Sequence, residues 1–351
     1  MPHSVTRVLV IRFSSMGDVI LTSPVVRALH VMLDGEVEVH FLTKSAFADA
    51  VQGLPGVHRV WTMERTTAEV EDGLRKVGFH YVVDLHANAR SAFVKRALRK
   101  REGRTFDLTV DKRSLDKILL VRTAWDRLEA QYVVERYAAT LRPFGDALRA
   151  LEQAGDRGGL SLPPLTSGQG ERRGDRQRAV LALGAAHEGK AIPESHWEQV
   201  IAGLLDAGHA VDLVGGPGEQ ALAARLMASC SAAADGAAAP LRMLTDVSWA
   251  ETFGTIAEAD VLIAGDTGAM HAGAALQVPM VVVWGCTSPA LGMGPWRAHP
   301  STVELEPMDP QRGRPCSRLG DRCRHRTPCI QRVAASRILD AACDVLSRTA
   351  P

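Results

Sequence analysis

Short runs of apolar residues alternate with longer amphipathic stretches in both halves of the chain. The first half has three such runs, at residues 8–11, 37–42 and 81–85. The second half has four, at residues 179–183, 210–214, 261–264 and 280–284. Each run has the length and side chains of a buried strand, and strands that alternate with helices predict parallel sheets covered on both faces. The pattern predicts an α/β chain of two doubly wound, Rossmann-like domains that face each other across a central cleft.

A change of composition separates the two halves. Residues 145–178 are rich in glycine, proline and charge, which is typical of a linker, although residues 147–153 could extend the helix before them. We therefore predict an N-terminal domain over residues 1–160, a linker over 161–178 and a C-terminal domain over 179–351. A chain of 351 residues has the length expected for two domains.

The overall composition is that of a soluble globular protein. Hydrophobic residues make up 46% of the chain and charged residues 23%. Lysine and arginine, 41 in all, nearly cancel the 40 aspartates and glutamates, so we expect no nucleic-acid partner. No segment approaches the apolar length of a membrane span, and the first seven residues lack the core of a signal peptide. These features predict a cytoplasmic protein.

One local excess of positive charge lies in residues 94–101, which carry five lysines and arginines. The simpler interpretation is the solvated end of a helix. The alternative is a surface that meets an anionic acceptor or makes peripheral contact with the inner face of a membrane.

Three of the six cysteines, Cys316, Cys323 and Cys329, lie close together near the end of the chain. Their spacings do not make a paired Cys-x-x-Cys site, although they could bind zinc if His325 completed the set. In a reducing compartment we prefer packed, reduced thiols in a C-terminal loop. We therefore expect no metal and no cofactor.

The residues directly after strands are the candidates for function, because ligands of doubly wound sheets bind beyond the carboxyl ends of the strands. The first such loop contains the sequence Ser-Ser-Met-Gly-Asp and ends at Asp18. Ser23 and Pro24 resemble an N-cap and a first helical position, which places Asp18 in the loop before that helix. There its carboxylate could act as a general base, or it could cap local N–H groups.

Three turns of the second half could bind an anionic ligand or a sugar attached to it. Residues 265–271 follow a buried strand and open a helix whose free N–H groups attract anions, or Asp266 or Thr267 simply caps that helix. Lys190, in a glycine-flanked loop, could neutralise a diphosphate or be solvated. Glu219, in a Gly-Gly-Pro-Gly-Glu turn, could accept hydrogen bonds from ribose hydroxyls or open the following helix.

None of these turns matches a Walker loop or the Gly-x-Gly-x-x-Gly fingerprint in its required context, which disfavours a dinucleotide-dependent dehydrogenase. Taken in order, however, residues 8–24, 81–91, 215–219 and 265–271 resemble the signatures of glycosyltransferase family nine. That family comprises the heptosyltransferases of lipopolysaccharide core assembly and their relatives. The ordered set extends over nearly the whole chain.

The resemblance implies a GT-B fold with an N-terminal acceptor domain and a C-terminal nucleotide-sugar domain, and an inverting transfer without an essential metal. Asp18 matches the proposed catalytic base, Lys190 the lysine that meets the donor phosphates, and Glu219 the carboxylate near the donor nucleoside. The loop for the donor diphosphate and sugar corresponds to Asp266, Thr267, Gly268 and His271. Candidates on the acceptor side are Ser14, Ser15, Gly17 and Arg90.

The partners that the resemblance implies are a nucleotide-sugar donor, ADP-heptose by family analogy, and a lipid-linked or core oligosaccharide acceptor. One departure bears on the donor, because the family usually has Lys-x-Trp-Pro where this chain has isoleucine at position 192. A different nucleotide sugar is therefore an alternative. A sugar-nucleotide epimerase and a binding protein without transferase activity are further alternatives, and the carboxylate of Asp18 argues against the last.

Overall fold

The computed structural model describes residues 5–99, 105–128, 131–165, 176–231, 240–308 and 314–349. The chain forms two compact units, one of Met1–Ser114 with Tyr132–Pro164 and the other of Leu115–Gln131 with Leu165–Pro351. The segment from Leu115 to Gln131 therefore belongs to the second unit although it precedes the end of the first. Residues 166–175 of the predicted linker lie outside the described residues.

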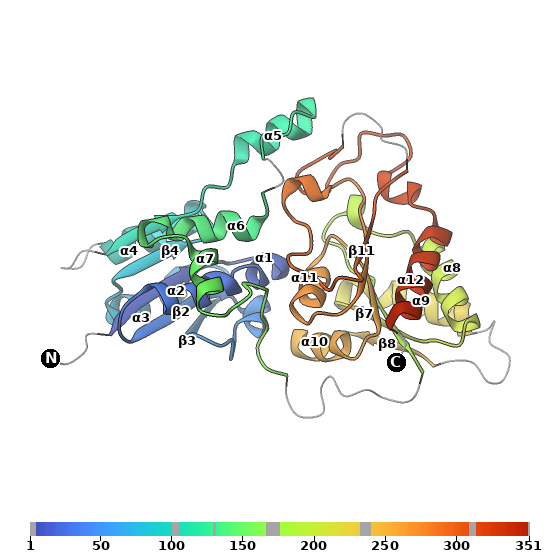
Figure 1. The fold of residues 1–351 in the computed structure, drawn as a ribbon, viewed down its shortest axis with the longest axis horizontal. Coiled ribbons are helices and arrows are strands. Elements are labelled where there is room, and N and C mark those ends of the chain that lie inside the picture. Colours follow the sequence, from blue (N-terminus) through green and yellow to red (C-terminus); the bar gives the residue numbers. More distant parts are fainter. Residues whose placement is uncertain are drawn as a thin grey trace. The chain divides into compact units, whose positions relative to one another are not determined.

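The first unit is built on a five-stranded parallel sheet in the order β3-β2-β1-β4-β5 (Figure 1). Its strands are β1 (Thr6–Ile11), β2 (Val37–Lys44), β3 (Val57–Met63), β4 (Tyr81–Asp84) and β5 (Phe106–Thr109). Its α-helices are α1 (Met16–Ile20), α2 (Ser23–Met32), α3 (Ala68–Val77), α4 (Ala89–Arg99), α6 (Val133–Ala138) and α7 (Ala147–Gln153). Short 3₁₀ helices are η1 (Ser45–Ala50) and η2 (Ala139–Phe144).

Both faces of this sheet are buried, as its continuous apolar strands require. On one face, Leu9 and Ile11 of β1 join a core to which α3 and α4 contribute Leu74 and Val94. Side chains alternate along a strand, so Val8 of β1 faces the other side, where it is equally buried. There α2 packs against β2, α6 and α7.

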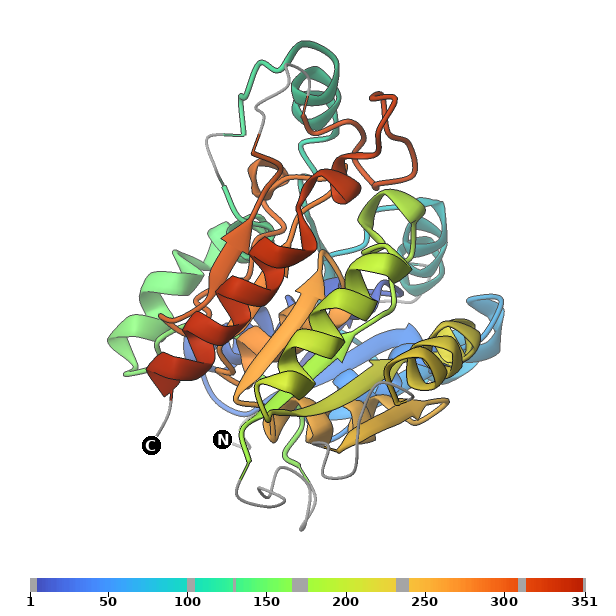
Figure 2. The ribbon, with the colours of Figure 1, turned by 90° about the vertical axis from the view of Figure 1, so that its right-hand side faces the viewer.

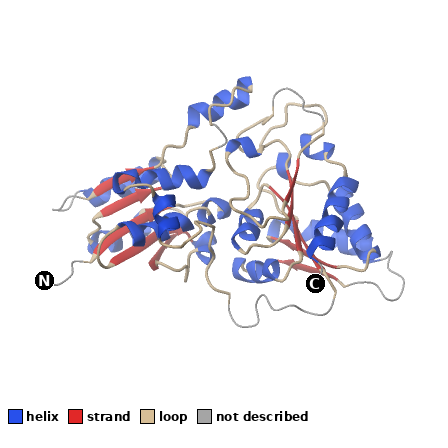
Figure 3. Ribbon diagram, in the orientation of Figure 1, coloured by secondary structure: helices blue, strands red, loops and turns tan. Residues whose placement is uncertain are grey.

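The second unit is built on a six-stranded parallel sheet in the order β11-β10-β9-β6-β7-β8. Figure 3 shows the strands in red and the helices in blue. Its strands are β6 (Arg178–Ala182), β7 (Ala210–Gly215), β8 (Leu241–Thr245), β9 (Val261–Gly265), β10 (Met280–Val283) and β11 (Val303–Leu305). Its α-helices are α5 (Ser114–Thr123), α8 (Glu194–Asp206), α9 (Gln220–Ser231), α10 (Trp249–Ala257), α11 (Gly268–Ala275) and α12 (Ala335–Thr349). Short 3₁₀ helices are η3 (Glu188–Lys190), η4 (Pro217–Glu219), η5 (Pro289–Leu291) and η6 (Cys329–Arg332).

Helices cover this second sheet on both sides as well. Figure 2 shows α12 in red and α8 in yellow-green lying in front of the strands, and their apolar side chains share one core with α9 and the sheet. On the opposite face α11 packs closely, because a Cβ added at Gly273 would lie 2.5 Å from Met280 Sδ and 2.6 Å from Leu262. Among the described residues, no helix is both long and apolar enough to cross a membrane.

The structure confirms the two doubly wound units and all seven predicted strands. Within the described part of the chain it adds four strands that the apolar runs do not show. These are β3, β5, β8 and β11, and each is an edge strand of its sheet. An edge strand is only partly buried, so it lacks a continuous apolar run. Residues 147–153 form a separate helix, α7, which begins at its own N-cap, Asp146, and does not extend the preceding helix.

Candidate active site

In the first unit the strand order reverses between β1 and β4, which are neighbours in the sheet. The loops that follow these two strands therefore meet at one edge, and this is where doubly wound sheets bind ligands. The structure places Asp18 and its neighbours after β1, and His86 to Arg90 after β4. The predicted acceptor-side residues thus belong to a single edge of one sheet.

The expectation that Asp18 lies in a loop is wrong. Asp18 lies in the short helix α1, whose N-cap is Ser15, and the two residues form a capping box. The Asp18 carboxylate accepts hydrogen bonds from the Ser15 backbone N–H at 3.3 Å and from the Ser15 hydroxyl at 3.0 Å. The N-cap of the following helix, α2, is Thr22 and not Ser23, and Ser23 is the first helical residue. The alternative role of Asp18, capping local N–H groups, is confirmed, and the Ser-x-x-Asp spacing is a capping-box signal.

Asp18 has partners far from it in the sequence. Its Oδ1 forms an ion pair with Arg12 at 2.8 Å and accepts a hydrogen bond from the Tyr137 hydroxyl at 3.1 Å. Burial disfavours the charged form, but the Arg12 charge and the hydrogen bonds from Ser15 and Tyr137 outweigh it and lower the pKa of Asp18 to about 2. A carboxylate with a pKa of about 2 is ionised at neutral pH, and 20% of the Asp18 side-chain surface is exposed, so it is accessible to a ligand.

The other predicted acceptor-side residues differ in accessibility. Ser15 and Arg90 are exposed, Ser14 is half-buried, and Gly17 is buried within α1. Arg12 and Tyr137 hold Asp18, and no role was predicted for either of them. Arg12 lies within residues 8–24, which resemble a family signature. No local sequence signal marks Tyr137, which lies 119 residues from Asp18.

His86 also lies at this edge, after β4, and the sequence predicted its place there but no role for it. Its ring lies 4.8 Å from the Phe13 ring, centroid to centroid, and its Nδ1 is buried without a hydrogen-bond partner in the described part of the chain. Burial and the nearby charges of Arg12 and Lys112 lower the pKa of His86 to about 4. The imidazole is therefore neutral at pH 7 and can donate or accept a hydrogen bond to a ligand hydroxyl.

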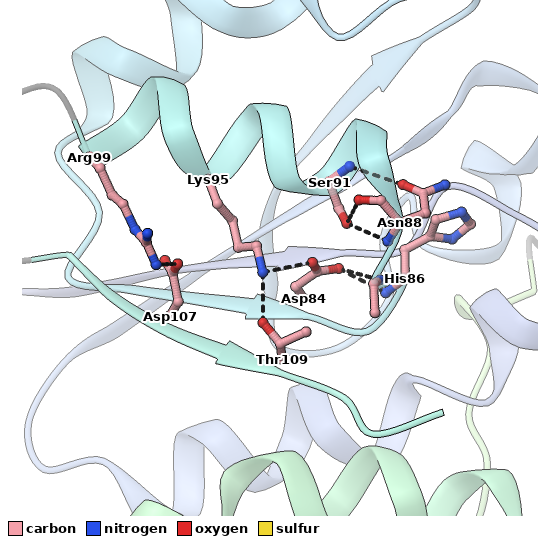
Figure 4. Close-up of polar contacts among 9 residues, drawn as sticks. Asp84, His86, Asn88, Ser91, Lys95, Arg99, Asp107 and Thr109 are labelled. Carbon is pink, nitrogen blue, oxygen red and sulfur yellow. Dashed lines mark hydrogen bonds and ion pairs between the residues drawn. The ribbon is translucent and has the colours of Figure 1, made fainter. Parts of the chain in front are cut away.

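The loop after β4 is anchored by Asp84, which is 1% exposed (Figure 4). Its Oδ1 accepts hydrogen bonds from the backbone N–H groups of His86 at 3.0 Å and Ala87 at 2.7 Å, and its Oδ2 pairs with Lys95 at 3.1 Å. Lys95 also donates to the Thr109 hydroxyl at 2.7 Å. The buried carboxylate thus fixes the loop that carries His86 and ties it to α4 and β5.

The same contacts define the basic stretch of residues 94–101. Lys95 pairs with Asp84 and Arg99 pairs with Asp107, so both are committed to contacts within their own unit (Figure 4). Arg96 is exposed. Lys100 and Arg101 lie outside the described residues.

In the second unit the strand order reverses between β6 and β9. The loop after β6 carries Lys190 and the turn after β9 carries Asp266, and the two side chains form an ion pair of 2.7 Å. Lys190 is 15% exposed and Asp266 4% exposed at the side chain. The structure thus brings together Lys190 and Asp266, the two residues predicted to lie near the donor diphosphate.

Three glycines allow the Lys190 loop to lie against the sheet edge. A Cβ at Gly189 would lie 2.4 Å from the Gly320 carbonyl oxygen, and one at Gly265 would lie 2.9 Å from that of Lys190. A Cβ at Gly285 would lie 2.1 Å from the Gly189 carbonyl oxygen. No real Cβ tolerates the shortest of these distances, so the backbone of the loop is packed as tightly as glycine permits.

The turn after β9 begins α11 with Thr267 as the N-cap and Gly268 as the first helical residue. The Thr267 side chain makes no capping hydrogen bond, and its hydroxyl is buried without a partner in the described part of the chain. An anion at the start of α11 would meet that hydroxyl and the first backbone N–H groups of the helix. His271 is 1% exposed and lies inside the unit, so its predicted contact with a donor stays a prediction.

Glu219 lies at the carboxyl ends of β6 and β7. Its carboxylate accepts a hydrogen bond from the Gly216 N–H at 2.8 Å and lies 3.3 Å from where a Cβ of Gly184 would be. It therefore ends η4 and lies beside the loop that leads to Lys190. Ile192, which replaces the usual aromatic residue of that loop, is 5% exposed and packs in the core.

We call the two sheet edges where the strand order reverses, after β1 and β4 and after β6 and β9, the switch points. Each switch point carries its own chemistry. The first unit offers an ionised carboxylate with a neutral imidazole, which suits a sugar hydroxyl, and the second offers a lysine beside a helix N-terminus, which suits a phosphate. Two doubly wound units of this kind are the architecture of the GT-B class, which includes nucleotide-sugar glycosyltransferases.

Comparison with known proteins agrees with this class. The model of the family described as "Glycosyltransferase family 9 (heptosyltransferase)" matches residues 68–319, and the chain belongs to that family. It is a glycosyltransferase of the heptosyltransferase type. It is 26% identical over 311 residues to lipopolysaccharide heptosyltransferase 1 of Pseudomonas aeruginosa, a match that covers 81% of this chain and 79% of that protein.

Solved structures are similar over almost the full length. The family 9 glycosyltransferase from Veillonella parvula has a TM-score of 0.75 with 16% sequence identity, and the match covers 98% of each chain. The Escherichia coli ADP-heptose LPS heptosyltransferase II has a TM-score of 0.72 with 18% identity, covering 98% of this chain and 99% of that one. These similarities establish the GT-B fold.

Proposed function

We propose that this chain is an inverting, metal-independent heptosyltransferase that moves heptose from ADP-heptose to a lipopolysaccharide-core acceptor. The observation that carries the proposal is the division of chemistry between the switch points, with the Asp18 carboxylate in one unit and the Lys190–Asp266 pair in the other. The relatives support the donor and pathway, because the curated relatives are lipopolysaccharide heptosyltransferases and one similar structure, E. coli heptosyltransferase WaaC, contains ADP.

In the proposed reaction Asp18 takes the proton of an acceptor hydroxyl as that oxygen bonds to the anomeric carbon of the donor. The bond between the anomeric carbon and the diphosphate oxygen breaks, and its electron pair leaves with ADP. A single displacement inverts the anomeric centre. A carboxylate with a pKa of about 2 is a weak base, but the hydroxyl becomes strongly acidic once its oxygen bonds to carbon, so Asp18 accepts the proton late in the step.

On the donor side, negative charge grows on the departing diphosphate while the sugar gains oxocarbenium character. Lys190, the Thr267 hydroxyl and the N–H groups at the start of α11 stabilise that charge. Glu219 receives the ribose hydroxyls of the nucleoside. Gly268 lets the phosphate approach the backbone, and His271 lies behind the turn as its buried support.

Metal independence has its own support in the donor residues. The Lys190 ammonium group, 2.7 Å from the Asp266 carboxylate, supplies a positive charge at the turn where the diphosphate is proposed to bind. We therefore expect transfer to proceed without added divalent cation.

The test is a thermal-shift titration with ADP, UDP and GDP, followed by a transfer assay with the matching nucleotide sugars. ADP at 100 times its dissociation constant should add about 2.7 kcal/mol of stability. The Lys190→Met variant should lose most of this stabilisation, and Lys76→Met, which changes an exposed lysine on α3, should keep it. Stabilisation by another nucleotide would show a different donor, and no stabilisation by any nucleotide would refute the transferase proposal.

A lipid-linked acceptor would bring the enzyme to a membrane surface, and we propose that α4 makes this contact. Phe93 is 64% exposed there, and Arg90 and Arg96 are exposed three residues to either side. An apolar ring between two arginines suits an anionic bilayer. Vesicles containing phosphatidylglycerol should sediment the wild-type protein but not Phe93→Ser/Arg96→Ser, and equal sedimentation of both would refute this contact.

A further inference from the structure

Four cysteine sulfurs converge in the second unit, and one of them comes from a part of the chain far from the others. Cys286 follows β10, whereas Cys316, Cys323 and Cys329 lie in the segment between β11 and α12. All four sulfur atoms lie within 4.8 Å of one another, and none is in a disulfide. The sequence spacing groups only the last three, with His325 as the potential fourth ligand. The structure supplies Cys286 instead.

The spacing of the sulfurs fits a single tetrahedral ion. Cys329 Sγ lies 3.6 Å from Cys316 Sγ and 3.7 Å from Cys323 Sγ. A zinc–sulfur bond of about 2.3 Å in a tetrahedron separates its sulfurs by about 3.8 Å. A disulfide would need about 2.0 Å. A cluster with inorganic sulfide between its irons would hold the thiolates farther apart than these contacts allow.

The surroundings suit a site with a negative charge. Four thiolates around a divalent ion carry a net charge of −2, and residues 314–326 contain five arginines against one aspartate. The backbone N–H of Cys329 points at Cys323 Sγ at 3.4 Å, which is the kind of contact that stabilises a metal-bound thiolate. Cys286, Cys316 and Cys329 are buried, while Cys323 is partly exposed and leaves a path for an ion to enter.

We propose that Cys286, Cys316, Cys323 and Cys329 bind one structural zinc ion. Four thiolates leave no open coordination position, so this zinc does no chemistry on the substrate. Its role is to join the strand-end loop after β10 to the segment before α12. That segment has few apolar side chains of its own, and the ion takes the place of a core.

The proposed zinc site also holds the loop that carries Lys190. The Cys286 N–H donates to the Gly189 carbonyl oxygen at 2.8 Å, and the Gly189 N–H donates to the Gly320 carbonyl oxygen at 3.0 Å. The Cys316 N–H donates to the Cys286 carbonyl oxygen at 2.8 Å. Gly189 therefore lies between two backbone segments that the metal would fix, and Lys190 follows directly. Loss of zinc should loosen that lysine.

Metal analysis of the full-length protein, purified without chelator, tests the site independently of activity. We expect about one zinc per chain by mass spectrometry. Cys323→Ser removes the most exposed ligand and should lower zinc affinity at least about 10-fold, measured in competition with a coloured chelator. Mutating even a residue that only hydrogen-bonds to a metal ligand lowers metal affinity by that factor. Cobalt substitution should give the visible absorption of a tetrahedral thiolate site in the wild type and lose it in Cys323→Ser.

Cys343→Ser is the matched control, since Cys343 is a partly exposed cysteine on α12 outside the cluster. It should retain zinc and the cobalt spectrum. A wild-type protein that neither contains nor takes up zinc has four packed thiols, and that result would overturn the proposal. One iron per chain in place of zinc would overturn the proposal as well. So would a zinc affinity of Cys323→Ser equal to that of the wild type.

The link to Lys190 rests on the proposed function and needs a second measurement. Zinc-stripped protein should bind ADP at least several-fold more weakly than the holoprotein by calorimetry, and restored zinc should recover the affinity. Equal ADP affinity in both forms would overturn the support of the Lys190 loop. If zinc is present but neither form binds ADP, the proposed donor fails and the metal site stands.

Discussion

Replacing Asp18 by asparagine tests the proposed base with the smallest change in shape. Asparagine keeps the volume of the side chain and can still bond to Ser15, but it cannot take a proton and carries no charge for Arg12. General-base catalysis contributes about 10²–10⁴-fold, so the rate of transfer should fall by that factor. Affinity for ADP should not change, because the donor residues belong to the other unit.

The same change has a cost in stability that the structure allows us to work out. The pKa of Asp18 falls from an ordinary 3.8 to about 2, and each unit corresponds to about 1.4 kcal/mol, so the folded state gains about 2 kcal/mol from ionised Asp18. Because the folded pKa is the lower one, this contribution is complete above the unfolded value of 3.8 and is lost as the pH falls through about 2. The stability gap between wild type and Asp18→Asn should therefore narrow below pH 4.

Two assays separate catalysis from stability. Urea unfolding at pH 7 and pH 3 gives the stability gap, and transfer kinetics at saturating donor give the rate. Tyr137→Phe is the matched control, since it removes one hydrogen bond to Asp18 at 3.1 Å and leaves the carboxylate in place. It should cost about 1 kcal/mol of stability and less than about 10-fold in rate.

Near-normal transfer by folded Asp18→Asn would remove Asp18 as the base. A loss of ADP affinity in that variant would contradict the assignment of the donor to the second unit. A stability gap that does not narrow between pH 7 and pH 3 would show that the Arg12 pair does not hold the pKa low.

Three further predictions follow from other residues. Lys190→Met leaves Asp266, 4% exposed, without its counter-ion and should lower the unfolding free energy by about 3–5 kcal/mol in urea titrations, beyond its effect on ADP binding. Lys95→Met does the same to Asp84, 1% exposed, and should destabilise by a similar amount while ADP affinity stays unchanged. The pH profile of kcat/KM should show no titration of His86 or of the proposed base between pH 5 and 8, because their pKa values are about 4 and 2, and an acidic limb near pH 6 would contradict both values.

The central strands of each sheet could be predicted because burial on both faces requires an unbroken apolar run. The edge strands could not, since β5 and β8 have no fully buried residue and their side chains mix polar and apolar types. The position of the candidate residues followed from topology alone, because parallel strands place their carboxyl ends along one edge. This is why Lys190 and Asp266, which lie 76 positions apart in the sequence, could be assigned to the same loop cluster before their contact was known.

Contacts that depend on tertiary packing could not be read from the sequence. Tyr137 reaches Asp18 from a helix that no motif marks, and only the packing of α6 within the first unit brings it there. No sequence spacing connects Cys286 to the later cysteines. They meet because Cys286 follows β10 and the later cysteines follow β11, and these two strands are neighbours in the sheet. The predicted loop position of Asp18 is wrong for a different reason. Ser23 and Pro24 do mark the start of a helix, but the Ser-x-x-Asp spacing marks an earlier helix of five residues, α1, that lies before it.

The pairing of Lys190 with Asp266 has a consequence for turnover in the proposed reaction. Before the donor arrives, the ammonium group is already neutralised by a carboxylate at 2.7 Å. The diphosphate must therefore share or replace that partner, and binding gains only the difference between two ion pairs. After transfer the same carboxylate competes with ADP for the lysine. In the proposed reaction Asp266 would therefore compete with ADP for Lys190, which would weaken the binding of the product and speed its release.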